Sequence, residues 1–145
     1  MTTTQAPGRE RADRAEITEL VSRLGLWLDE QRWDNARSVL TDDATAETLG
    51  GTASGLEAVV EQARRNHTKP GIGTQHVITG AVVEVDGDRA TIGANLLVTF
   101  FERAEVTRPV YQLGERYGFE AVRTPAGWRL SRVRVTPLWR VGERP

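Results

Sequence analysis

The chain of 145 residues contains no cysteine, one lysine and two histidines. The absence of cysteine excludes disulfides, thiolate nucleophiles and cysteine-based zinc or iron–sulfur sites. The histidines, His67 and His76, are nine residues apart, on elements that we predict to be different. That spacing matches no recognised metal-ligand pattern. No glycine-rich nucleotide-binding motif stands between a strand and a helix. We therefore expect neither a metal nor a cofactor.

The chain also has no excess of charge of either sign and no long apolar run. The formal net charge is −1, whereas a protein that binds nucleic acid or an anionic membrane is expected to carry an excess of positive charge. No apolar run approaches the ~20 residues that a membrane helix needs. The first residues, "MTTTQAPGRER", lack the apolar core of a signal peptide. We therefore expect a cytoplasmic protein that binds neither nucleic acid nor membrane.

The first part of the chain predicts a tail followed by helices. Residues 1–12 are polar and are expected to form a disordered tail, which leaves a single domain over 13–143. Shorter helices are predicted over 33–40 and 56–67. The first and longest helix ends at Asp29. It is predicted from apolar residues at three- and four-residue spacing, namely Ile17, Leu20, Val21, Leu24, Trp27 and Leu28.

The rest of the chain is typical of strands. A short strand is expected over 45–48, after a break at "TDDA". Four longer segments alternate between apolar and polar residues, with a hairpin turn at "DGD" between the first two. They are 74–85, 89–101, 110–123 and 128–140. This order predicts an α+β fold in which the N-terminal helices pack on a curved antiparallel sheet. Such a sheet forms a cone with room for an apolar pocket.

Three segments resemble the SnoaL-like branch of the nuclear-transport-factor-two-like superfamily. They are "LWLDEQRWDNARSVLTDDAT" (26–45), "TQHVITGAVVEVDGDRATI" (74–92) and "RTPAGWRLSRVRVTPLW" (123–139). The resemblance covers about 13–142 and is carried by the order and spacing of the segments. It implies a cone-shaped α+β barrel whose pocket lies between the first helix and the concave sheet. It also implies a homodimer formed through the outer face of the sheet.

Two residues match the pattern of scytalone dehydratase within this superfamily. Asp29 corresponds to the aspartate that ends the first helix, and His76 to the histidine of a "TQH" segment. The resemblance implies that the pair lines the pocket and serves a water-mediated acid/base elimination. The reference pKa of histidine, about 6.5, suits proton transfer near neutrality. The family's second histidine has no counterpart here, and Leu28 replaces its tyrosine.

Other members of the superfamily match less well. Leu24 and Thr48 stand where ketosteroid isomerase has its tyrosine and its catalytic aspartate, so we reject that activity. Limonene epoxide hydrolase needs an Asp–Arg–Asp set inside the barrel. Its nearest equivalents here combine one of Arg116, Arg132 and Arg134 with Glu115 or Glu120, and strand alternation alone does not show which of these point inward.

Simpler roles compete with catalysis at each candidate position. His76 is either a pocket acid/base or a strand residue that donates to a nearby carbonyl. Asp29 is either functional or a helix-terminal polar residue, although the helix dipole disfavours a carboxylate there by about 0.3–1 kcal/mol. Asn95 faces either solvent or the pocket. We expect His67 to be an exposed residue in the last turn of its helix.

The sequence favours an enzyme that works without a cofactor in an apolar pocket. Its reaction is expected to be the dehydration, cyclisation or isomerisation of a hydrophobic polyketide- or terpenoid-like intermediate in natural-product biosynthesis. Asp29 and His76 are the predicted catalytic residues. A non-catalytic small-molecule-binding or dimerisation module of the same fold is the alternative. The predicted pocket residues are Trp27, Trp33, Asn95, Glu115 and Tyr117.

Overall fold

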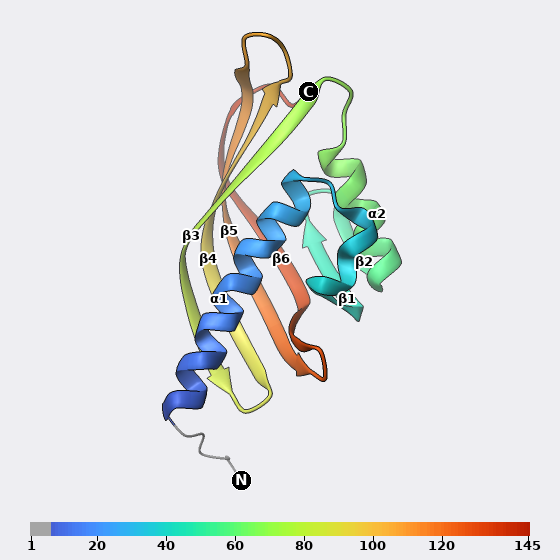
Figure 1. Cartoon of the computed structure of the whole chain (residues 1–145). Helices are drawn as coiled ribbons and strands as arrows, with labels where there is room; N and C mark the ends of the chain where they lie inside the picture. Colours follow the sequence, from blue (N-terminus) through green and yellow to red (C-terminus); the bar gives the residue numbers. More distant parts are fainter. Residues whose placement is uncertain (1–6) are drawn as a thin grey trace.

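Helix α1 (Pro7–Asp29) runs diagonally across the sheet in the computed structural model (Figure 1). The structure describes residues 7–145. The expected tail is wrong for residues 7–12, because they form the first turns of α1. The remaining tail residues, 1–6, lie outside the described residues. None of the helices within the described part of the chain is both long and apolar enough to cross a membrane.

Two further helical segments follow α1. The 3₁₀ helix η1 (Trp33–Ser38) is shorter than predicted, whereas α2 (Leu56–His67) has the predicted bounds. After η1 the chain enters the sheet at Leu40, five residues earlier than expected. Asp42 and Asp43 suggested a break. The strand continues through them with both side chains exposed, but its pairing with β6 shifts register between Leu40 and Thr45.

Six strands form one curved sheet in the order β2-β1-β6-β5-β4-β3. Neighbouring strands are antiparallel except β1 and β6, which run parallel. The antiparallel pairing predicted for the four long strands is confirmed, and β1 adds one parallel pair beside β6. These two strands are separated along the chain by α2 and four other strands, and parallel neighbours need such a long crossover. The strands are β1 (Leu40–Thr48), β2 (Gly51–Ser54), β3 (Ile72–Asp86), β4 (Arg89–Glu102), β5 (Arg108–Thr124) and β6 (Gly127–Gly142).

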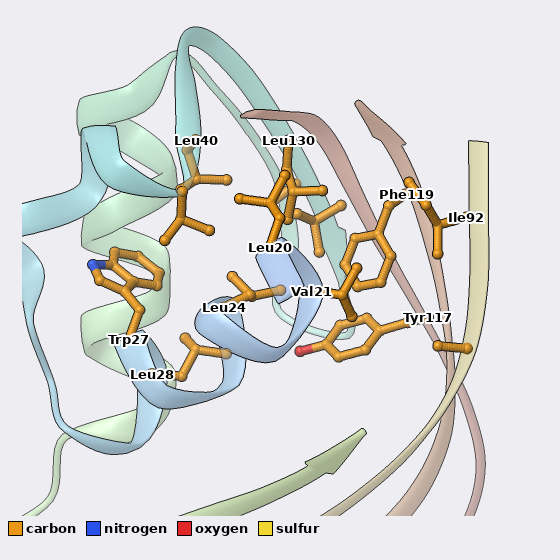
Figure 2. Packing of buried hydrophobic residues seen from close by; sticks show 14 of the residues in the cluster. Leu20, Val21, Leu24, Trp27, Leu28, Leu40, Ile92, Tyr117, Phe119 and Leu130 are labelled. Atoms are coloured by element: carbon orange, nitrogen blue, oxygen red, sulfur yellow. The ribbon is translucent and has the colours of Figure 1, made fainter. Parts of the chain in front are cut away.

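The hydrophobic core lies between α1 and the concave face of the sheet. In Figure 2, Leu20 of α1 points toward Leu130 and Val21 points toward Phe119, and all four belong to one buried cluster. Each fully buried side chain of this kind contributes roughly 1.5–3 kcal/mol. This half of the helix is packed against the sheet, whereas Leu24, Trp27 and Leu28 border a cavity.

Gly25 brings the second half of α1 close to β3. A Cβ atom at this position would lie 3.2 Å from Cδ1 of Ile78 and 3.7 Å from Cβ of His76. Glycine inside a helix costs about 1 kcal/mol relative to alanine, and here it allows this close approach. Asp29, one turn further along α1, is thereby held against the beginning of β3.

A buried ion pair fastens the first half of α1 to the sheet. The carboxylate of Asp13 accepts hydrogen bonds from Nη1 and Nη2 of Arg123, at 2.8 and 2.7 Å, and from Nε1 of Trp128, at 3.1 Å. The Arg123 hydrogen bonds hold the pKa of Asp13 below its usual value. The side chain of Asp13 is only 6% exposed, so these three donors replace its water.

Candidate active site

Asp29 and His76 form a hydrogen-bonded pair between the end of α1 and the beginning of β3. Oδ1 of Asp29 lies 2.6 Å from Nδ1 of His76 and accepts a second hydrogen bond, at 3.1 Å, from the Thr74 hydroxyl. Oδ2 accepts the backbone N–H of His76 at 2.8 Å. Three donors from one short stretch of β3 therefore fix the carboxylate.

The arrangement gives the two residues different positions. The imidazole of His76 is 2% exposed and lines the cavity, whereas Asp29 is 18% exposed and lies behind it, outside the cavity wall. A carboxylate accepts hydrogen bonds and does not donate them, so the neutral imidazole carries its proton on Nδ1. Its Nε2 is then free to accept a proton.

The cavity holds about 340 Å³ and lies between α1, α2 and the concave sheet. This volume falls in the lower part of the range for small-molecule sites. Its wall is mainly apolar. Leu24, Trp27 and Leu28 come from α1, and the sheet contributes Leu40, Ala46, Leu96, Val98, Phe100, Leu113, Val133 and Val135.

Two polar residues of β5, Glu115 and Tyr117, face this apolar wall. Glu115 is 7% exposed, and its burial raises the pKa of the carboxyl group above the usual value. Burial and the nearby carboxylates of Glu115 and Asp29 likewise raise the pKa of Tyr117. Figure 2 shows the Tyr117 hydroxyl directed from the sheet toward α1. Both residues, with Trp27, lie where the sequence analysis expected pocket residues.

The structure places two other predicted pocket residues elsewhere. Asn95 is exposed on the convex face of β4, while its neighbours Ala94 and Leu96 point inward. Trp33 packs edge-on against Trp27, with ring centres 5.0 Å apart, and lines a shallow surface groove between η1 and α2. The expectation that Asn95 and Trp33 line the pocket is wrong, because strand alternation and the η1 turn direct them away.

His67 lines the cavity from the end of α2, although its sequence position predicted an exposed residue. Its ring lies 5.0 Å from that of His76 and is parallel to that of Phe100, at 6.5 Å. Nδ1 donates to the Ala63 carbonyl at 2.7 Å, which leaves Nε2 as an acceptor. Burial, helped by the neighbouring His76, lowers the pKa of His67 to about 4. The expectation that His67 is exposed is therefore wrong.

A helical spacing would have identified His67. It follows Ala63 by four residues, and Ala63 follows the buried Val59 by four. All three lie on one face of α2, since residues four apart in a helix are neighbours. Despite this second histidine, no group of three or more His, Cys, Asp or Glu residues in the region 7–145 is arranged to hold a metal ion.

The chain belongs to the SnoaL-like domain family, whose sequence profile matches residues 9–134. No curated protein matches it. A crystal structure of the Kfla4162 protein from Kribbella flavida is 30% identical, with a TM-score of 0.78 over 91% of this chain and 95% of that one.

Two solved structures with assigned activities share the fold at lower identity. A type 2 hexachlorocyclohexane dehydrochlorinase, LinA, is 21% identical, with a TM-score of 0.78 over 97% of this chain and 98% of that one. A protein provisionally designated a scytalone dehydratase, from Novosphingobium aromaticivorans, is 14% identical, with a TM-score of 0.79 over 97% and 93% of the two chains. These similarities establish the nuclear-transport-factor-two-like fold with enzymes among its neighbours.

Proposed function

We propose that this SnoaL-like protein is a cofactor-independent enzyme of natural-product biosynthesis. It acts on a hydrophobic polyketide- or terpenoid-like intermediate by proton transfer, and of dehydration, cyclisation and isomerisation we favour dehydration. The observation that carries the proposal is a single one. An imidazole whose Nδ1 is bound to a fixed carboxylate at 2.6 Å presents its other nitrogen to an apolar cavity.

His76 acts as the general base in this proposal. Its Nε2 removes a proton from a carbon next to a substrate carbonyl, and the imidazole becomes an imidazolium. Asp29 is a positioning residue, because it fixes the tautomer and then stabilises the positive charge that forms beside it. Its three hydrogen-bond donors hold it in place before the substrate arrives, so no reorganisation is needed during the reaction.

Glu115 supplies the proton for the leaving group. Because burial raises its pKa, part of its population is a neutral carboxylic acid at a pH where an exposed glutamate is ionised. When the substrate's C–O bond breaks, the departing oxygen takes the proton of Glu115 and leaves as water. His76 has then gained one proton and Glu115 has lost one, and exchange with water restores both.

The names of two structural neighbours favour elimination over the other reactions. One is a dehydrochlorinase and the other is designated a dehydratase. Each of these reactions removes a proton and a leaving group from neighbouring atoms, which needs a base in an otherwise apolar site.

The homodimer remains part of the proposal. It is supported by exposed Trp139 and Val141 on β6, with the Trp139 ring lying over the outward face of Gly114.

The test uses a bicyclic β-hydroxy ketone, 3-hydroxy-1-tetralone, which yields fluorescent 1-naphthol when it loses water. We expect His76→Gln and Asp29→Asn to fold normally and to lose about 10²-fold or more in rate, as general acid–base groups do. Asp34→Asn is the matched control, since Asp34 is exposed on η1. If the substrate is bound but recovered unchanged, the protein is a binding module instead. If both variants turn over at the wild-type rate, His76 and Asp29 are not the acid/base pair, and the proposed mechanism fails.

A further inference from the structure

The opening of the cavity carries positive charge from three separate segments. Arg65 lies in the last turn of α2, Lys69 lies between α2 and β3, and Arg144 follows β6. All three line the cavity and are exposed, which places them at its opening. Among the cavity-lining residues of the described chain, Glu115 alone is acidic, and it lies in the buried wall.

These three cations have no acidic partner in the described part of the chain. Arg64, the neighbour of Arg65, binds Glu61 within α2. An unpaired cation at the rim of an apolar site attracts anions, since field lines concentrate in a cleft with low-dielectric walls.

Arg144 is the best placed of the three. Its Nη2 donates to the Asn66 carbonyl at 3.3 Å, and its guanidinium carbon lies 5.5 Å from the ring centre of Phe100. Figure 1 shows the C-terminus beside the segment that joins α2 to β3. The charge of Arg144 reaches the buried groups, because it adds to the lowering of the His67 pKa and opposes the effect of burial on the Glu115 pKa.

We propose that the substrate is an apolar ring compound that carries a carboxylate. The carboxylate binds between Arg144 and Lys69, and the rings fill the cavity. This inference rests on the proposed function and specifies its substrate class. A carboxylate with one negative charge suits the opening better than a phosphate with two. The C-terminal end of α2 lies at the opening, and its partly negative carbonyl groups repel a doubly charged anion more strongly.

The test compares 2-naphthoate with 2-naphthamide, which has nearly the same shape and no charge. Both are titrated into ¹⁵N-labelled protein, and amide shifts give the Kd and the position of binding. We expect the wild type to bind naphthoate about tenfold more tightly than naphthamide at low salt, and the preference to shrink as salt screens the charges.

Substitution of the cations should remove this preference selectively. Arg144→Gln and Lys69→Gln should each weaken naphthoate binding about three- to fivefold, the scale of a solvent-exposed ion pair, and leave naphthamide unchanged. Arg89→Gln is the matched control. Arg89 is an exposed arginine at the β3–β4 turn, outside the cavity.

Three results would overturn the inference. They are equal affinities for the two ligands in the wild type, a preference that survives the Arg144→Gln/Lys69→Gln double substitution, and shifts that map away from the cavity. Failure here is separable from failure of the proposed function, because affinity requires no turnover. Tetralone dehydration that depends on His76, without a charge preference, would refute only the carboxylate. A charge preference without dehydration would refute only the enzyme.

Discussion

Asp13 should contribute more to stability than any surface ion pair of this protein. Replacing it by alanine removes two charge-assisted hydrogen bonds from Arg123, each worth about 1.5–3 kcal/mol. It also leaves the buried Nε1 of Trp128 without its acceptor, at a cost of about 1–3 kcal/mol. Relief of the buried charge offsets part of the total. We expect Asp13→Ala to lower the free energy of unfolding by about 3–4 kcal/mol, in line with the breaking of a buried pair.

The assay is urea unfolding followed by tryptophan fluorescence, and the matched control is Asp88→Ala. Asp88 binds Nε of the same Arg123 at 2.9 Å, but its side chain is 76% exposed, so its loss should cost under about 1 kcal/mol. The catalytic rate of the folded Asp13→Ala variant should not change, because the ion pair lies outside the cavity. Equal losses for the two variants, or a loss below about 1 kcal/mol for Asp13→Ala, would refute the reasoning.

The stabilisation by the Asp13–Arg123 pair should depend on pH. Arg123 lowers the pKa of Asp13 in the folded protein, whereas the unfolded chain has the ordinary value of about 3.9. The unfolded state therefore binds the proton first as the pH falls. The stabilisation is fully present above the unfolded value and is lost as the pH drops through the folded value. The difference between wild type and Asp13→Ala should shrink accordingly in acid.

Two buried groups of the cavity should give pH dependences of opposite sign. His67 has a folded pKa of about 4, so its neutral form stabilises the fold above pH ~6.5, and this contribution is lost toward pH ~4. His67→Gln should flatten that acid-side decline in urea midpoints, and an unchanged profile would contradict the burial of His67. Glu115 has a raised pKa, so its ionisation destabilises the fold as the pH rises above about 4.3. Glu115→Gln should match wild type near pH 4 and have a higher melting temperature at pH 8; equal melting temperatures at pH 8 would argue against a buried carboxyl.

Much of the fold could be predicted because its signals are local. The apolar stripe of α1, the bounds of α2 and the alternation of β3–β6 all follow from side-chain periodicity. The parallel pairing of β1 with β6 could not be predicted, because it joins strands far apart in the sequence and depends on the crossover through α2. The start of β1 could not be predicted, because Asp42 and Asp43 are exposed acids at a register shift within the strand, and such residues resemble the start of a loop.

The candidate site was predictable only in part. Asp29 and His76 were found through the family resemblance, but their separate positions, one behind the wall and one in it, depend on how α1 crosses β3 at Gly25. The spacing of His67 from Val59 and Ala63 predicts the inner face of α2, but its approach to Phe100, 33 residues away along the chain, does not follow from the sequence. Asn95 was misplaced because Leu97 and Phe101, on the same face of β4, are also apolar, so the sequence after Asn95 does not show which face is the outer one.

The backbone hydrogen bond from His76 to Asp29 has a consequence for how this site can change. Residue 76 holds the carboxylate partly through its main-chain N–H, which every residue except proline possesses. The carboxylate therefore keeps this main-chain hydrogen bond with any residue other than proline at position 76, and the Thr74 hydroxyl supplies a second, side-chain hydrogen bond. A single substitution at position 76 exchanges the group presented to the substrate without dismantling its support. The groups that bind the carboxylate are thus largely separate from the side chain that faces the substrate, so a new side chain at position 76 can change the chemistry while the surrounding structure is kept.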